Sequence, residues 1–281
     1  MTVTSRVSLL IMAIICSGCF PWQAPERLKK YTNTKDALAD KENARYVSLY
    51  NAGLKEMPAD DLTKLPNLVK LSLRKNNLGS VPGAIGNLSN LAWLDIGEAQ
   101  LGSVPPEIGK LSKLTTLYLD DNQMSGIPSD IGRLSSLKYL NLDRNKLSSL
   151  PKEIGKLSGL KWLHLNGNQL PALPAEIGDL SSLERLYVSN NSLSDLPAEL
   201  GKLAKLTDLS MTGNQFSNMP LAVLNLPNLN RLSLDNNKLT CMPPDINKLQ
   251  NLQWLQLGGN SFSEEEKNRI RQALPNCLVI F

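Results

Sequence analysis

The stretch from Leu137 to Ser182 reads LKYLNLDRNKLSSLPKEIGKLSG and then LKWLHLNGNQLPALPAEIGDLSS, which is one 23-residue pattern written twice. The windows 183–205 and 229–251 fit it as well, with the consensus LxxLxLxxNxLxxLPxxIGxLxx. The repetition runs to the C-terminus in about ten copies, of which the first, Ala44–Asn67, is 24 residues long. A unit of this length cannot bury its own core, so we expect a coil of stacked turns.

The two halves of the pattern favour different conformations. The xLxLx segment alternates apolar and polar residues, as a short strand with one buried face does, so Leu140 and Leu142 are expected to point inward. The proline of LPxxIGxL ends the strand, and the few residues left favour extended chain and 3-10 turns on the convex side. We therefore predict an α/β leucine-rich-repeat solenoid, an arc with short parallel strands on its concave face.

Position nine of the repeat is nearly always asparagine. A short amide there can turn inward and hydrogen-bond the backbone of the bend, whose buried N–H and C=O groups need partners. In two turns the position holds Ala52 or Ala99, where water or a neighbouring backbone is expected to substitute. The asparagines are Asn76, Asn122, Asn145, Asn168, Asn191, Asn214, Asn237 and Asn260.

The ends of the chain depart from the repeat and are predicted to be caps. Ser263 can N-cap a helix whose first turn is acidic, Pro275 stops that helix, and residues 277–281 can add a last strand. A short helix is expected in the N-terminal cap. The predicted segments are 1–18, a signal peptide; 19–43, a linker and the N-terminal cap; 44–262, the repeats; and 263–281, the C-terminal cap.

The N-terminus has one arginine, an apolar run from Val7 to Ile15 and then small residues. This is the layout of a secretory signal, and the run is too short to span a bilayer. Ser17-Gly18-Cys19 resembles a bacterial lipobox, so Cys19 is the predicted lipidation site. Ordinary secretion after cleavage and an uncleaved disordered tail are the alternatives. No disulfide is expected between Cys241 and Cys277, because a whole repeat and the cap helix separate them.

Composition argues against several function classes. The net charge of +4 over 281 residues comes from mixed lysines and acids, whereas a nucleic-acid-binding protein shows a one-sided basic face. If Cys19 is lipidated, only Cys241 and Cys277 remain and they are far apart in sequence; with one histidine besides, we predict no metal site and no cofactor. His164, Asp143 and Ser189 lie on neighbouring turns, but an open sheet offers no oxyanion hole, so no enzyme activity is predicted.

The signal, the KENARYVSL entry, the 23-residue turns and the closing EEEKNRIRQALPNC cap together resemble the bacterial leucine-rich-repeat lipoproteins typified by the leptospiral family. The resemblance implies a cell-envelope or secreted protein that binds other proteins, in some members host surface components. It implies no particular ligand.

Positions three, five, seven and eight of each turn are expected to face solvent on the concave side, because the inward positions are already apolar. Tryptophan and tyrosine concentrate at positions three and five, and exposed rings of this kind dominate binding hot spots. The alternative is that aromatic residues merely suit strands and stack there. The predicted ligand contacts are Trp93, Tyr118, Tyr139, Trp162, His164 and Tyr187.

A group of acids is predicted along the edge of this row. Like charges side by side on strands are unfavourable, so a basic partner, a cation or solvent screening at an open site must offset them; Arg144 can neutralise part of the group. The predicted acidic contacts are Glu98, Asp120, Asp121 and Asp143. A basic patch one or two turns away, which would divide the concave face into two electrical halves, consists of Lys70, Arg74 and Lys75.

These observations favour a non-enzymatic recognition module that binds a protein ligand on its concave aromatic face, at the bacterial outer membrane or cell surface, held there by a lipid on Cys19. The alternatives are a periplasmic structural scaffold and a secreted effector that acts on host proteins.

Overall fold

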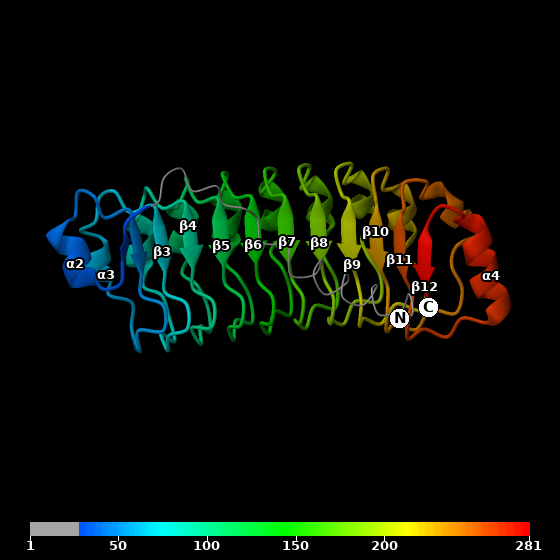
Figure 1. The fold of residues 1–281 in the computed structure, drawn as a ribbon, viewed down its shortest axis with the longest axis horizontal. Helices are drawn as coiled ribbons and strands as arrows, with labels where there is room; N and C mark the ends of the chain where they lie inside the picture. Colours follow the sequence, from blue (N-terminus) through cyan, green and yellow to red (C-terminus); the bar gives the residue numbers. More distant parts are fainter. Residues whose placement is uncertain (1–27) are drawn as a thin grey trace, which may run out of the picture.

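The computed structural model describes residues 28–281 and consists of one 12-stranded parallel sheet, in which each strand pairs with the next in sequence order. Figure 1 shows the strands stacked side by side along the whole length of the molecule. This arrangement confirms the predicted leucine-rich-repeat solenoid. The strands are β1 (Lys30–Tyr31), β2 (Tyr46–Ser48), β3 (Lys70–Ser72), β4 (Trp93–Asp95), β5 (Thr116–Tyr118), β6 (Tyr139–Asn141), β7 (Trp162–His164), β8 (Arg185–Tyr187), β9 (Asp208–Ser210), β10 (Arg231–Ser233), β11 (Trp254–Gln256) and β12 (Leu278–Ile280).

Equivalent repeat positions lie in register from strand to strand, because the strands from β3 to β11 are each separated by the same 23 residues. Leu117, Leu140 and Leu163 are paired in this way and are all fully buried. Each leucine therefore packs on the same residue of the turn before and the turn after, which makes one continuous core.

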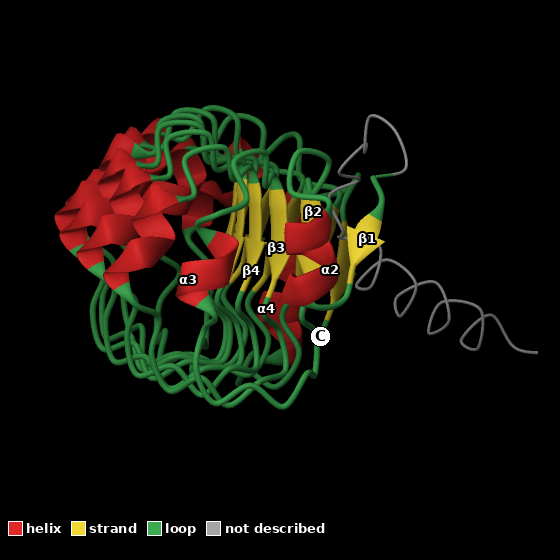
Figure 2. Ribbon diagram, turned by 90° about the vertical axis from the view of Figure 1, so that its left-hand side faces the viewer, coloured by secondary structure: helices red, strands yellow, loops and turns green. Residues whose placement is uncertain are grey.

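The convex side consists of short helical turns, as the sequence predicted, and Figure 2 shows them on the side opposite the strands. A Cβ on Gly132 would lie 2.4 Å from the carbonyl oxygen of Glu153 in the next turn, so only glycine lets the turns stack this closely. The first convex element is the α-helix α3 (Ala59–Leu62), and the 3-10 turns are η1 (Gly83–Asn87), η2 (Pro106–Lys110), η3 (Ser129–Arg133), η4 (Lys152–Lys156), η5 (Ala175–Asp179), η6 (Ala198–Lys202), η7 (Leu221–Asn225) and η8 (Pro244–Lys248).

The asparagine ladder is confirmed. Asn145 Nδ2 donates to the carbonyl of Leu119 in the turn before (3.0 Å) and to that of Leu142 in its own turn (3.1 Å). Its Oδ1 accepts from the N–H of Met124 (3.1 Å). Where the ladder lapses at Ala99, the alanine's own carbonyl accepts from the N–H of Leu78 (3.1 Å), so backbone replaces the missing amide as expected.

Both ends are capped. At the N-terminus, α2 (Thr34–Ala39) begins at Asn33, whose side chain accepts from the N–H of Asp36; strand β1 before it was not predicted. At the C-terminus, α4 (Glu264–Ala273) begins at Ser263, whose Oγ accepts from the N–H of Glu266. Strand β12 then pairs with β11, as the sequence predicted.

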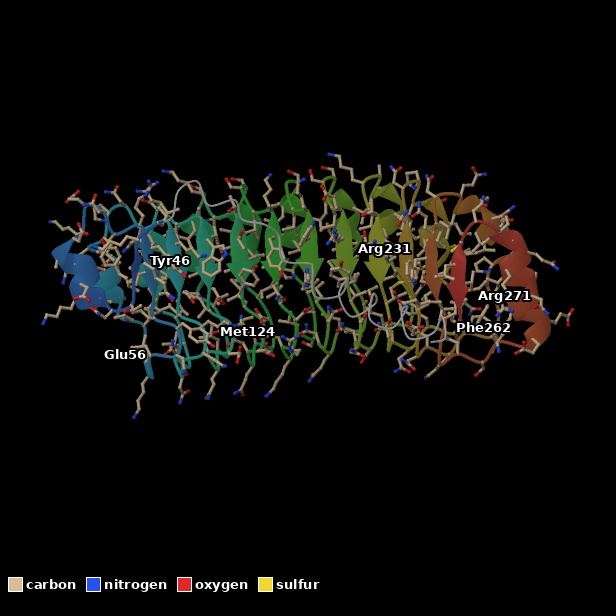
Figure 3. The ribbon with its side chains drawn as sticks, in the orientation of Figure 1. Tyr46, Glu56, Met124, Arg231, Phe262 and Arg271 are labelled. Atoms are coloured by element: carbon tan, nitrogen blue, oxygen red, sulfur yellow. The ribbon has the colours of Figure 1, made fainter. Side chains whose placement is uncertain are left out.

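The C-terminal cap is fastened by an ion pair. Glu266 accepts from the N–H of Met242 (2.7 Å), and Arg269 donates to both Glu266 and the carbonyl of Met242. The rings of Phe262 and Phe281 meet edge to face, and Figure 3 labels Phe262 at this end of the molecule. These contacts close the apolar end of the coil.

Candidate functional site

The predicted aromatic residues form one continuous row across β4 to β8. Successive ring centroids lie 5.7 Å apart for Trp93 and Tyr118, 4.8 Å for Tyr118 and Tyr139, and 5.1 Å for Tyr139 and His164. The row ends at Tyr187, which meets the His164 ring edge to face at 4.7 Å. Because the strands are in register, side chains 21 to 25 residues apart in sequence become neighbours.

The expectation that all these rings face solvent is wrong for two of them. Tyr139 is 5% exposed and Trp162 is 7% exposed. Neighbouring strands are only about 4.8 Å apart, so rings on adjacent strands cover each other's flanks. Tyr139 contacts three other rings, and its burial raises the pKa of its hydroxyl. The half-buried residues of the row are Trp93, Tyr118, His164 and Tyr187.

A cation lies over a ring toward each end of the row. Lys70 Nζ is 4.2 Å from the centre of the Trp93 ring, and the Arg185 guanidinium is 4.3 Å from that of Trp162. Cation–π contacts at this distance are favourable, more so when partly desolvated. Lys70 is thus engaged with the aromatic row, and burial lowers its pKa.

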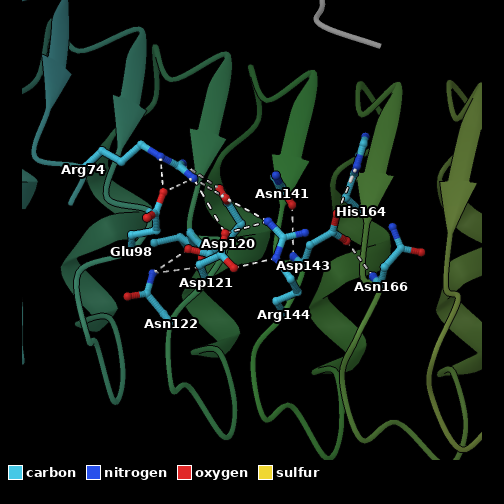
Figure 4. A network of polar contacts seen from close by, with 12 residues as sticks. Arg74, Glu98, Asp120, Asp121, Asn122, Asn141, Asp143, Arg144, His164 and Asn166 are labelled. Atoms are coloured by element: carbon cyan, nitrogen blue, oxygen red, sulfur yellow. Dashed lines mark hydrogen bonds and ion pairs between the residues drawn. The ribbon is translucent and has the colours of Figure 1, made fainter. Parts of the chain in front are cut away.

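The acidic group is arranged around Arg74, whose side chain crosses two turns (Figure 4). Its guanidinium lies 2.8 Å from Asp120, 3.0 Å from Glu98 and 3.3 Å from Asp95. Arg144 holds Asp121 at 2.5 Å from the other side. The predicted separation into a basic and an acidic half is therefore wrong: Arg74 belongs to the acidic group.

The acids are also less open to water than expected. Asp120 is 3% exposed and Asp143 is 7% exposed, so direct ion pairs and hydrogen bonds, and not screening by bulk solvent, offset their charge. Asp143 accepts from the N–H of Asn166 (2.6 Å). Burial raises the pKa of Asp95, a member of this group that sequence reasoning missed although it is the position-five neighbour of Tyr118.

The triad of His164, Asp143 and Ser189 is not assembled. His164 Nδ1 lies 3.5 Å from Asp143, but the Ser189 hydroxyl bonds Ser210 at 2.7 Å. His164 Nε2 is buried without a hydrogen-bond partner among residues 28–281. A serine nucleophile needs a hydrogen bond to its base, and that contact does not occur.

Two further expectations concern the described part of the chain. Cys241 and Cys277 are both free, as predicted, and burial raises the pKa of the Cys277 thiol to about 11. No helix among residues 28–281 has the length and apolar character needed to cross a membrane. Cys19 lies outside the described residues, so its predicted lipidation stays a prediction.

Comparisons with known proteins agree with this architecture. The model of the leucine-rich repeat region matches residues 42–138 and 127–215, more than half of the chain. No curated protein sequence matches. An internalin from Listeria monocytogenes has 24% identity and a TM-score of 0.64 over 80% of this chain and 70% of its own. A leucine-rich-repeat protein of Leptospira interrogans has 25% identity and a TM-score of 0.48, over 90% of this chain and 100% of its own.

A plant receptor ectodomain is also similar. The Arabidopsis receptor kinase HAESA, solved in complex with an N-terminally extended IDA peptide hormone, has 32% identity and a TM-score of 0.66. The match covers 78% of this chain but only 39% of the HAESA chain, so this protein spans about two fifths of that ectodomain.

Proposed function

We propose, since this chain belongs to the leucine-rich-repeat family, that it is a non-enzymatic recognition module of the bacterial cell envelope that binds a protein ligand on its concave aromatic face. The observation that carries the proposal is the aromatic row from Trp93 to Tyr187, in which neighbouring rings are in contact from β4 to β8. Leucine-rich-repeat proteins serve in general for protein recognition, and the HAESA ectodomain was solved with a peptide bound.

The burial of Tyr139 and Trp162 divides the row into two roles. Trp93, Tyr118 and Tyr187 keep part of their surface exposed, so they are the proposed contacts. Tyr139 and Trp162 hold their neighbours in place. Rigid aromatic side chains bury much area at small cost in conformational entropy, which suits them to a hot spot.

The binding face is tested by pull-down with the full-length protein, followed by surface plasmon resonance on the captured ligand. Tyr118→Ala and Tyr187→Ala should each weaken binding by about 2 kcal/mol or more. The matched controls are Lys156→Ala and Lys202→Ala on the convex side, which should bind like wild type. The opposite result, with convex variants impaired and aromatic variants unchanged, would move recognition to the convex side.

Placement in the envelope is the second part of the proposal and rests on Ser17-Gly18-Cys19 after an apolar run. A diacylated Cys19 would anchor the protein stably, since stable membrane binding takes more than one acyl chain. Mass spectrometry of the membrane-extracted protein should find Cys19 as an acylated N-terminus, and an unmodified N-terminus elsewhere contradicts the anchor. Protease access on intact cells separates a surface protein from a periplasmic scaffold, and recovery from the culture supernatant indicates a secreted effector.

A further inference from the structure

A second surface feature lies on the flank where the chain enters β8 to β11, and it meets the row of rings at Arg185, which lines it and lies over Trp162. It is an open hollow, and of its lining residues only Leu252 is apolar. Figure 3 labels Arg231, which lies on its wall, over β9 and β10. Carbon atoms of the long polar side chains contribute nearly as much of its exposed surface as the polar atoms do, so the hollow offers many hydrogen-bonding groups beside hydrocarbon.

Repeat register concentrates carboxamides in this hollow. Asn228 and Asn251 occupy the last position of their turns, Asn230 and Gln253 occupy position two, and Asn276 comes from the C-terminal cap. Since equivalent positions on neighbouring turns are about 4.8 Å apart, the amides stand in two short columns.

The N-terminal flank provides an internal comparison. A similar hollow there is lined by Asn67 and Asn90 at the last position, but by Arg45, Val69 and Ala92 at position two. The two hollows have the same repeat backbone, so the paired amide columns at the C-terminal end result from the residue types at these positions and not from the fold.

Several of these polar groups are unused within residues 28–281. The side chains of Gln253, Asn276 and Lys205 make no hydrogen bond or ion pair there, although all three residues are exposed. Asn228 and Asn251 each donate through Nδ2 to a backbone carbonyl at 2.7 Å. Their Oδ1 atoms accept no hydrogen bond from a described residue. Such groups are therefore available to a ligand.

The chemistry of these groups selects the ligand. A carboxamide presents a donor and an acceptor side by side, which is what a hydroxyl-bearing ligand requires. Arg231 and Asp208, paired at 3.2 Å, add a fixed donor and a fixed acceptor.

From this arrangement we infer that the C-terminal hollow is a binding site for an oligosaccharide, recognised through its hydroxyl groups by the two amide columns. The two proposals are tested separately, because Tyr118 and Tyr187 do not line the hollow and Gln253 and Asn276 do not belong to the aromatic row. A sugar ring carries several hydroxyl groups that can pair with neighbouring amides of both columns, whereas an extended peptide presents one N–H and one C=O per residue.

The test is isothermal titration calorimetry of the full-length protein with cellotetraose, chitotetraose, a heparin tetrasaccharide and tetraglycine. At least one of the two uncharged tetrasaccharides should bind. Gln253→Ala and Asn276→Ala should each weaken that binding about fivefold, as expected for the loss of one or two hydrogen bonds. The matched control is Gln169→Ala, an exposed glutamine on another surface, which should stay within about twofold of wild type.

Three results would overturn the inference. The first is no heat with either uncharged sugar; the second is equal affinity of the hollow variants and Gln169→Ala for the bound sugar. The third is a preference for tetraglycine, which indicates a peptide site, or for the heparin fragment alone, which indicates attraction of an anion to Lys205, Arg185 and Arg231. Gln253 and Asn276 make no side-chain contact that the fold depends on, so loss of folding is not the expected cause of weaker binding.

Discussion

Replacing Asn145 by alanine tests the hydrogen-bonded ladder that holds the turns together. Three strong hydrogen bonds disappear: those to the carbonyls of Leu119 and Leu142, and the one from the N–H of Met124, all between 3.0 and 3.1 Å. Each net hydrogen bond contributes about 1 kcal/mol, so Asn145→Ala should destabilise the protein by about 3 kcal/mol. Asn145 is 7% exposed, so the backbone groups it bonds have little access to bulk water.

A second variant separates hydrogen bonding from size. Asn145→Asp keeps the shape and the acceptor for Met124, but turns a carboxylate oxygen toward two carbonyl oxygens. It should therefore be less stable than Asn145→Ala at pH 7. Its folded-state pKa should lie above the unfolded value of about 3.9, so stability is lost as the pH rises through this range and recovered as it falls.

The assay is urea unfolding followed by far-ultraviolet circular dichroism at pH 7 and pH 4, with the slope of each transition compared to detect partial unfolding. An alanine variant within about 0.5 kcal/mol of wild type would refute the ladder as a source of stability. An aspartate variant as stable as wild type at pH 7 would show that the hydrogen bonds donated by Asn145 Nδ2 do not stabilise the fold.

Three other outcomes follow from the same geometry. Leu142→Ala should cost about 2–5 kcal/mol in urea melts, because the side chain is fully buried in the middle of the core. Gly155→Ala should lower the thermal melting temperature, since its Cβ would lie 2.5 Å from a carbonyl of the next turn, whereas Gly126→Ala, with nothing within 4 Å, should not. The hydrogen bond from Arg269 lowers the pKa of Glu266. The stability that the Glu266 carboxylate contributes is therefore present at neutral pH and lost as the pH falls through this lowered pKa. Amide hydrogen exchange in α4 should differ between wild type and Glu266→Gln at neutral pH, and this difference should vanish in acid.

The periodic features of the fold were predictable because they depend only on position within the repeat. The strand, the inward leucines and the ladder asparagine each follow from local geometry that recurs every 23 residues. The C-terminal cap was predictable for a similar reason, since an N-cap serine before acids marks a helix start. Strand β1 was missed because Lys30 and Tyr31 carry no alternation by themselves and pair with β2 only through tertiary contact.

The contacts and exposure of side chains on the concave face could not be predicted from the sequence, because they depend on residues in other turns. Arg74 was assigned to a separate basic patch because its nearest repeat neighbours are lysines, yet its hydrogen bond to Asp120 joins residues 46 apart in sequence. The exposure of Tyr139 was misjudged for the same reason: a residue can point away from the core and still be buried by its neighbours on the concave face. Orientation follows from the period, whereas burial depends on which side chains stand on the adjacent turns.

The backbone bears a cost where the ion-paired group lies. The residue before the ladder position has a positive φ in each turn; it is glycine or asparagine in six turns and a charged residue at Lys75, Glu98, Asp121 and Arg144. The left-handed conformation costs a residue with a side chain about 1–2 kcal/mol relative to the right-handed one. At three of the four charged positions an ion pair accompanies this cost, because Glu98 lies 3.0 Å from Arg74 and Arg144 lies 2.5 Å from Asp121. Lys75 instead lies over the Tyr50 ring. Glycine or asparagine is enough for stacking in the later turns, so the charged residues of the central turns add an ion-paired surface at the expense of backbone stability.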